Sequence, residues 1–283
     1  MALFYDMMRL MLITSLVLLG LCLGSFVNAL VWRLHEQAKP KKKQAFTGKD
    51  LSIVSGRSRC VKCKHVLGAA DLVPVLSWLF LRGKCRYCDH KIDDAPWVEL
   101  TLPVLFVISY LQWPQTFDAS GWTAFAVWLV LLTGLLALAV YDIRWMLLPN
   151  RIVFPLIAIA GAHVIIQAAV FDSGFMSLVW SVLSACIAGG VFYLLWVINN
   201  AWIGGGDAKL GYILGLAVAS PTKAFLILFG GSVFGLIYSL PLMAAHRLNS
   251  KSQVPYGPFL IAAAFVSQLW GDKLAHWYTT LLL

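Results

Sequence analysis

Charged residues are scarce in this chain. Of its 283 residues only 12% are Asp, Glu, Lys or Arg, whereas 60% are hydrophobic, and this balance excludes an ordinary soluble domain. A glycine-rich nucleotide loop followed by a well-spaced acid is also missing, so a Rossmann-type cofactor site is not supported. No basic stripe is interleaved with aromatic residues, and the net charge of +9 lies mostly in loops. Nucleic acid is therefore not an expected partner.

Long apolar runs are the dominant feature. Runs of about 20 residues can cross a hydrocarbon core of roughly 30 Å as helices, and a backbone in lipid must satisfy its own hydrogen bonds, which favours helices. The chain is predicted to be all-α, a polytopic membrane helix bundle of about eight spans with a small cytoplasmic loop domain. The sixth expected span is short and glycine-rich. The spans are residues 10–32, 96–113, 122–141, 152–171, 176–198, 207–220, 224–244 and 257–281.

The distribution of basic residues predicts the orientation. The first apolar run is too long for a secretory signal and no small-residue cleavage site follows it, so we expect a retained helix. With the N-terminus outside, the inner segments hold 19 of the 22 Lys and Arg residues, which agrees with the positive-inside rule. Their charge is expected to contact anionic lipid. These inner segments are residues 33–95, 142–151, 199–209 and 245–256.

Two acidic residues, Asp142 and Asp207, lie at the ends of apolar runs on the predicted cytoplasmic side. A carboxylate at a membrane boundary is costly unless it faces protein or water. The three glycines at 204–206 let the backbone near Asp207 approach whatever the carboxylate contacts. The alternative, that both are solvated loop acids, suits Asp207 poorly. The pair is predicted to share one proton and to activate water, which points to aspartyl hydrolysis at the membrane surface.

Four cysteines form two C-x-x-C pairs in the polar segment 33–95. They are Cys60, Cys63, Cys85 and Cys88, with 21 residues between the pairs. This spacing suits tetrahedral thiolate coordination of a structural zinc ion, and disulfides are disfavoured in a reducing compartment. A segment this small lacks a core, so a metal would help to stabilise it. A redox role for one pair is the alternative, but two pairs favour zinc.

Several short motifs follow one another along nearly the whole chain, and together they resemble the type IV prepilin peptidase family of bacterial membrane enzymes. Each is weak alone, but their order and placement are specific. Two departures are visible: Asn150 stands where the family often has Asp, and His35 where it often has Pro. Neither involves the two aspartates, so activity is expected to survive them. The motifs are Gly24-Ser25-Phe26-Val27-Asn28 with Arg33-Leu34, the four-cysteine loop with Gly83-Lys84-Cys85, Trp97-Val98-Glu99-Leu100, the Asp142 segment ending in Leu148-Pro149, Gly204-Gly205-Gly206-Asp207-Ala208-Lys209, and Pro255-Tyr256-Gly257-Pro258-Phe259.

The resemblance implies two reactions. The family removes the leader of a prepilin or pseudopilin after a glycine on the cytoplasmic side, with the catalytic pair at the positions matched by Asp142 and Asp207. It then N-methylates the new N-terminal residue with S-adenosylmethionine. The cytoplasmic loop and the positions matching Gly83 and Lys84 are linked to methylation. Glu99 could orient the substrate amine; a carboxylate favoured by the helix dipole at a helix N-terminus is the alternative.

The resemblance also implies a place in the cell and partners. The chain is expected in the bacterial inner membrane, with its N-terminus outside and its active site facing the cytoplasm. Prepilin or pseudopilin substrates and membrane lipid are expected partners, and other proteins of pilus or secretion-system assembly are candidates. Lys209 is expected either to pair with an aspartate or a substrate carboxylate, or to extend to the membrane interface. The domains expected are an N-terminal transmembrane helix (1–32), the zinc loop (33–95) and a transmembrane aspartyl protease domain (96–283).

Three other functions could also place two acids at the ends of membrane spans. A presenilin-like or signal-peptide-peptidase-like protease also uses a Gly-x-Gly-Asp motif, but the four-cysteine loop and the Asp142 segment argue against it. A transporter would use the two acids as an ion pathway, yet carriers usually place such acids near the bilayer midplane at broken helices. A scaffold protein would need neither aspartate.

Overall fold

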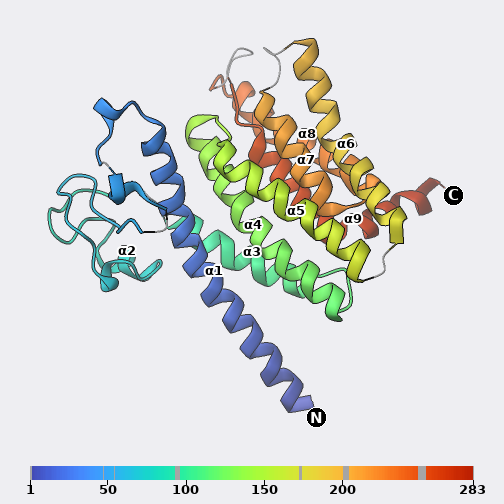
Figure 1. Cartoon of the computed structure of the whole chain (residues 1–283), viewed down its shortest axis with the longest axis horizontal. Coiled ribbons are helices and arrows are strands. Elements are labelled where there is room, and N and C mark those ends of the chain that lie inside the picture. The colour runs from blue at the N-terminus through green and yellow to red at the C-terminus, as the bar shows by residue number, and fades with distance from the viewer. Residues whose placement is uncertain are drawn as a thin grey trace. The chain divides into compact units, whose positions relative to one another are not determined.

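The computed structural model describes residues 2–46, 48–53, 55–92, 96–171, 174–199, 204–247 and 253–282. Within these ranges the chain forms α-helices and short 3-10 turns, and its β structure is limited to isolated bridges. The all-α prediction is therefore confirmed. The chain divides into two compact units, Met1–Leu111 and Gln112–Leu283, which can be followed by colour in Figure 1.

The first unit contains two long helices and the polar loop. Helix α1 (Ala2–Ala38) packs against α3 (Trp97–Leu111) along two glycines of α1. A Cβ added at Gly20 would lie 2.5 Å from Cα of Pro103, and one at Gly24 would lie 2.7 Å from Cα of Glu99. Small residues four apart allow this close helix crossing in membrane proteins. Between the helices lie the short elements η1 (Lys41–Lys43), η2 (Gly48–Leu51), η3 (Ala69–Asp71) and α2 (Leu76–Phe80).

The second unit is a bundle of six helices within the described residues. Helices α6 and α7 approach each other most closely, because Gly211 and Gly215 of α7 lie against the backbone of Ala188 and Ala185 in α6. Helix α4 supplies much of the core, with Leu131, Leu132, Leu135 and Leu138 fully buried. The six helices are α4 (Ala119–Trp145), α5 (Asn150–Val170), α6 (Gly174–Ile198), α7 (Gly205–Val218), α8 (Pro221–Ala244) and α9 (Gly257–Leu282).

Each of the eight predicted spans coincides with a helix, but only five described helices are long and apolar enough to cross a membrane: α1, α4, α5, α6 and α8. Helix α3 has 15 residues and α7 has 14. A helix as short as α7 measures about 21 Å, less than a hydrocarbon core of roughly 30 Å. Helix α9 is longer, but carries Gln268, Asp272 and Lys273. The multi-pass membrane character is thus confirmed, whereas the count of eight is only approximate.

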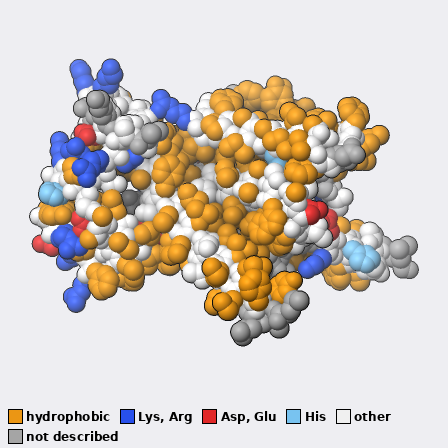
Figure 2. All heavy atoms as spheres, turned by 60° about the horizontal axis from the view of Figure 1, so that its bottom comes forward, with side chains coloured by type: hydrophobic (Ala, Val, Ile, Leu, Met, Phe, Trp, Pro, Cys, Tyr) orange, Lys and Arg blue, Asp and Glu red, His pale blue; other side chains and the backbone are white. Residues whose placement is uncertain are grey.

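The surface agrees with that character. Large hydrophobic side chains are exposed along the helices, including Phe175, of which 76% is accessible. Figure 2 shows hydrophobic side chains over much of the visible helical surface, while Lys and Arg gather over the loop of the first unit. Such a division between apolar helices and a basic loop is typical of membrane proteins whose loops contact water and lipid headgroups.

Candidate active site

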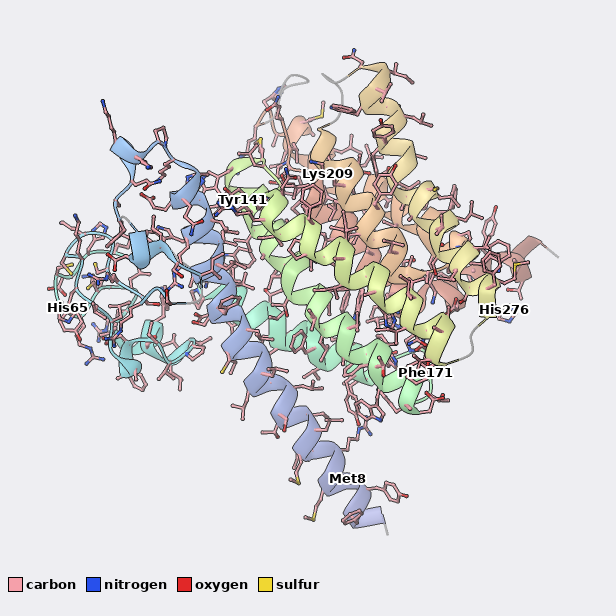
Figure 3. All side chains as sticks on the ribbon, viewed as in Figure 1. Met8, His65, Tyr141, Phe171, Lys209 and His276 are labelled. Carbon is pink, nitrogen blue, oxygen red and sulfur yellow. The ribbon has the colours of Figure 1, made fainter. Side chains whose placement is uncertain are left out.

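Asp142 and Asp207 come together at one end of the second unit. Asp142 lies in the last turn of α4 and Asp207 in the first turn of α7, and the two carboxylates interact electrostatically. Asp142 is buried, with 6% of its surface accessible. In Figure 3 the residues labelled Tyr141 on α4 and Lys209 on α7 lie near the same end of this bundle, whereas Phe171 lies near the other end. The fold therefore brings together two acids that lie far apart in the sequence.

The N-terminus of α9 completes the environment of Asp142. The backbone N–H of Gly257 donates a hydrogen bond of 3.0 Å to Oδ2 of Asp142. A Cβ on Gly257 would lie only 2.8 Å from that oxygen, so a side chain here would disturb the carboxylate. The partial positive charge at a helix N-terminus stabilises a nearby anion. In the sequence Gly257 stands out only as part of a motif, although a glycine followed by Pro258 marks a helix start.

One of the three glycines before Asp207 explains how the two acids meet. A Cβ on Gly206 would lie 3.1 Å from Cδ1 of Leu148, in the segment that follows Asp142. The missing side chain therefore lets the start of α7 lie directly against the end of the Asp142 segment. Around Gly204 the nearest atom to an added Cβ is Oδ2 of Asp207 at 3.7 Å, an ordinary contact. Close packing accordingly requires Gly206 more than Gly204.

Tyr256 faces the second acid of the pair. Its phenol interacts electrostatically with Asp207, and its hydroxyl lies 3.3 Å from Oγ of Ser232. Burial raises the pKa of Tyr256. The hydroxyl therefore stays protonated and keeps a proton to donate. The neighbouring residues Tyr256 and Gly257 thus interact with different aspartates, Tyr256 with Asp207 and Gly257 with Asp142.

Lys209 has a partner outside the acidic pair. Its Nζ donates a hydrogen bond of 2.9 Å to Oδ1 of Asn150 and lies 5.6 Å from the ring centroid of Phe154. Both partners belong to α5, so Lys209 ties the first turn of α7 to the first turns of α5. The resemblance led us to expect Asp at position 150, and either residue offers an oxygen to the lysine.

The four cysteines of the loop form one cluster. Their Sγ atoms all lie within 4.8 Å of one another, and those of Cys60 and Cys88 are 3.7 Å apart. Tetrahedral zinc with Zn–S bonds of about 2.3 Å places its sulfurs roughly 3.8 Å apart, so the cluster fits this ion. All four are free thiols. Burial raises the pKa of Cys60, but hydrogen bonds from the backbone of Cys63 and Lys62 outweigh it and lower the pKa to about 7.

The two cysteine turns have the same backbone design. In each, the N–H of the first cysteine donates to the carbonyl five residues later, from Cys60 to His65 at 3.0 Å and from Cys85 to His90 at 2.8 Å. The rings of His65 and Tyr87 contact each other across the two turns, with centroids 3.7 Å apart and planes tilted by 31°. Each turn also places the residue four after its first cysteine in the left-handed conformation, namely Lys64 and Asp89. The repeated shape has a counterpart in the sequence, because both turns read C-x-x-C-x-His, with His65 and His90 at the accepting position.

The residues that the resemblance links to methylation lie around the short helix α2. Gly83 has a positive φ of 69°, and a Cβ there would lie 3.0 Å from the indole of Trp78. Glu99, in the first turn of α3, accepts a hydrogen bond of 2.6 Å from the N–H of Val75. Val75 has φ +61°, a strained conformation for a β-branched residue. Gly83 and Glu99 therefore act at opposite ends of α2, whereas Lys84 is exposed on the turn beside it.

Comparison with known proteins agrees with these features. Residues 18–113 match a family model described as the bacterial peptidase A24 N-terminal domain, and residues 129–240 match the type IV leader peptidase family. A prepilin leader peptidase/N-methyltransferase of Aeromonas salmonicida is 30% identical over 95% of this chain and 94% of its own length. The enzyme of the same name from Bacillus subtilis is 29% identical over 96% and 99%. The chain belongs to the type IV leader peptidase family.

Family membership settles the choice among the alternatives. The resemblance expected from the motifs is confirmed, and a presenilin-like protease, a transporter and a scaffold are not supported. No solved structure matches the chain. The leader peptidase match contains both Asp142 and Asp207, and the N-terminal match contains the four cysteines with Gly83 and Glu99. Tyr256 and Gly257 lie beyond both matched regions, so their place beside the aspartates comes from the structure.

Proposed function

We propose that this leader peptidase removes the leader from type IV prepilins and pseudopilins after a glycine, and then N-methylates the new N-terminal residue with S-adenosylmethionine. Relatives that match over nearly their whole length carry both activities in their names. The observation that supports cleavage most directly is the meeting of Asp142 and Asp207 at one end of the second unit, with the N–H of Gly257 bonded to Asp142.

In the proposed cleavage the two aspartates divide the work. Asp142 is the ionised partner, because the N–H of Gly257 stabilises its negative charge, and it takes a proton from water. Asp207 is protonated and gives its proton to the scissile carbonyl oxygen while the water oxygen bonds to the carbon. When the C–N bond breaks, Asp142 returns its proton to the leaving amine and a hydroxyl of the intermediate reprotonates Asp207. The products are the leader acid and the pilin amine.

The proposed placement puts this chemistry at the cytoplasmic face of the inner membrane, with the N-terminus outside. The concentration of Lys and Arg in the segments that would face inward supports this orientation. A prepilin joins a short leader to an apolar helix, so its cleavage site would lie at the same membrane surface. The division into a first transmembrane helix (1–32), a loop (33–95) and a protease domain (96–283) is part of this proposal.

Two cofactors belong to the proposal. Cys60, Cys63, Cys85 and Cys88 would hold a structural zinc ion, which the spacing of their sulfurs fits. S-adenosylmethionine, when bound, supplies the methyl group. Gly83, Lys84 and Glu99 are the residues proposed to serve methylation: Gly83 and Glu99 through their positions at the two ends of α2, and Lys84 from the exposed turn.

Cleavage of a prepilin tests the proposal directly. Purified full-length protein would be incubated with a prepilin, and the products identified by mass spectrometry, beside the variants Asp142→Asn and Asp207→Asn. The expected result is a single cut after the glycine by the wild-type protein and no cut by either variant. A wild-type protein that is folded in detergent but leaves several prepilins intact would contradict the peptidase assignment.

A further inference from the structure

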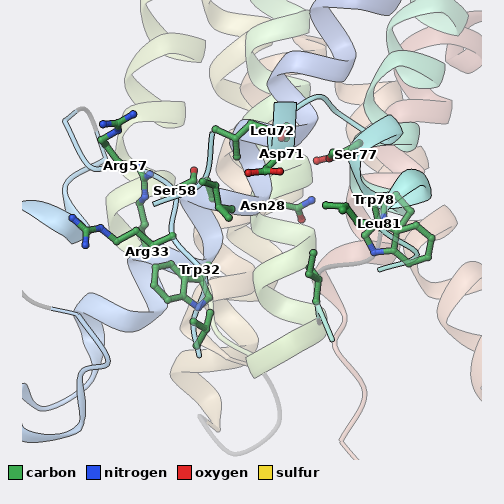
Figure 4. A pocket seen from close by; sticks show the side chains of 18 of the residues that line it. Asn28, Trp32, Arg33, Arg57, Ser58, Asp71, Leu72, Ser77, Trp78 and Leu81 are labelled. Carbon is green, nitrogen blue, oxygen red and sulfur yellow. The ribbon is translucent and has the colours of Figure 1, made fainter. Parts of the chain in front are cut away.

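A cavity of about 200 Å³ lies within the first unit. Its walls come from three parts of that unit: α1, which supplies Asn28 and Trp32; the loop, which supplies Arg59 and Trp78; and the first turn of α3, which supplies Glu99. Figure 4 shows several of these side chains around the space. None of the four cysteines lines it, so the cavity is distinct from the metal cluster.

Three residues that line this cavity each carry a buried polar atom without a hydrogen-bond partner among the described residues. The atoms are Oδ1 of Asn28, Nε of Arg59 and Nε1 of Trp78. Asn28 has only 8% of its surface accessible. Buried polar groups in folded proteins are nearly always satisfied. One acceptor and two donors without a partner, all on residues that line one cavity, therefore favour a polar ligand there.

The side chains at the cavity match the chemistry of an adenosine. An asparagine amide can bond an adenine through two atoms, its oxygen accepting from the N6 amine and its nitrogen donating to N7. Indole rings such as those of Trp32 and Trp78 provide faces on which a base stacks. The N–H groups of Arg59 and Trp78 are donors suited to the hydroxyl oxygens of a ribose.

Gly83 acts on this cavity from behind Trp78. The N–H of Gly83 bonds the carbonyl of Trp78 at 2.9 Å, and a Cβ on Gly83 would lie 3.0 Å from the indole ring. A side chain at this position would crowd the indole and shift it by a few tenths of an ångström in the cavity wall. Gly83 is therefore a positioning residue for Trp78, which explains how a glycine without functional atoms can matter for methylation.

We propose that this cavity holds the adenosine part of S-adenosylmethionine, with Asn28 on the adenine and Trp78 and Arg59 on the ribose. The assignment rests on the proposed methyl transfer and names the site that serves it. Pockets that enclose a whole drug-sized ligand measure roughly 300 Å³ or more. The smaller cavity therefore takes one half of the donor, and the methionine half lies outside it.

Binding of S-adenosylhomocysteine to the full-length protein in detergent tests the site without depending on turnover. Calorimetry would compare the wild-type protein with Asn28→Leu, Trp78→Phe and Gly83→Ala. Asn28→Leu and Trp78→Phe each remove one hydrogen bond to the ligand and are expected to weaken binding about tenfold. Gly83→Ala is expected to weaken binding as well, because the added Cβ crowds the indole of Trp78. Gly48→Ala is the matched control for Gly83→Ala, because Gly48 also has a positive φ (58°) but nothing within 4 Å of an added Cβ. Trp97→Phe, outside the cavity, controls for Trp78→Phe.

Photolabelling of the wild-type protein with 8-azido-S-adenosylmethionine provides a second measurement that needs no variant to fold. The adduct is expected on peptides covering residues 25–33 or 76–85. An adduct confined to residues 112–283, or three variants that bind S-adenosylhomocysteine as the wild type does, would overturn the cavity assignment and leave methyl transfer standing. A wild-type protein that cleaves prepilin but binds neither compound would instead refute methyl transfer itself.

Discussion

The backbone N–H of Gly257 donates a 3.0 Å hydrogen bond to Oδ2 of Asp142, a residue 115 positions earlier in the chain. Through this contact the start of α9 meets the end of α4, where the first turn of α7 also brings Asp207. Two helix N-termini therefore face a pair of acids. Their partial positive charges stabilise the one negative charge that the pair carries when it shares a single proton.

Replacing Gly257 by alanine should impair cleavage with little effect on folding. Because the new Cβ would lie 2.8 Å from Oδ2 of Asp142, the carboxylate must move. A misplacement on the order of 1 Å can lower a rate about a hundredfold, and a loss of that size is expected in a prepilin cleavage assay. Gly190→Ala, which has nothing within 4 Å of the added atom, is the control. Equal cleavage by both variants would show that Gly257 does not position Asp142.

The two aspartates should behave as one unit. Asp142→Asn and Asp207→Asn are each expected to lower cleavage by roughly a thousandfold or more, and the double variant should be no slower, because residues that act together are strongly non-additive. Asp272→Asn is the control, since Asp272 is exposed and pairs with Lys223 at 2.8 Å. Initial rates measured over a range of enzyme concentrations decide the matter. Additive losses, or one single variant near the wild-type rate, would contradict a shared mechanism.

Purified protein should carry about one zinc ion per chain. Replacing Cys60 and Cys63 by serine should release the ion, because two thiolates cannot complete a tetrahedral site. Metal should also be lost as the pH falls, since thiolate ligands must be deprotonated. Metal analysis of reduced protein measures both effects, with Cys186→Ser, outside the cluster, as the control. Cleavage is expected to suffer less than methylation, and metal-free protein with an unchanged loop would rule the site out.

Asn150→Asp should be tolerated. The change places a carboxylate where Oδ1 of Asn150 now accepts from Lys209 at 2.9 Å, and so converts a hydrogen bond into an exposed ion pair. Exposed pairs contribute about 1 kcal/mol or less, so the melting temperature should rise only slightly and cleavage should stay near the wild-type rate. A large loss of cleavage would mean that Asn150 serves the catalytic pair as well as Lys209.

Processed pilin should gain about 14 Da at its new N-terminus when S-adenosylmethionine is supplied, because one methyl replaces one hydrogen on the amine. Mass spectrometry of the product measures this gain. Lys84→Ala should lower the methylated fraction while leader removal, carried out by the aspartates, continues. An unmodified amine at saturating donor would make this chain a peptidase alone.

Much of the architecture follows from local sequence. The lengths of the apolar runs predicted a helical membrane protein, because the thickness of the hydrocarbon core and the need to satisfy backbone hydrogen bonds leave few other solutions. The two C-x-x-C pairs predicted a cluster of four sulfurs, since each short turn already brings two of them together. Position at the ends of apolar runs singled out Asp142 and Asp207 from the other acids. These features depend mainly on residues that are close together in the sequence.

Other features depend on packing between distant segments. The apolar sequence of α7 predicted a membrane span. The helix has only 14 residues, however, and its side chains Leu210, Ile213 and Leu214 are fully buried in protein. Sequence alone also could not reveal what Gly257 and Gly83 do. Only the tertiary structure places Gly257 against Asp142 and Gly83 against Trp78, because a missing Cβ becomes meaningful when another segment comes within about 3 Å of the space it leaves, and the chain's local pattern carries no record of that approach.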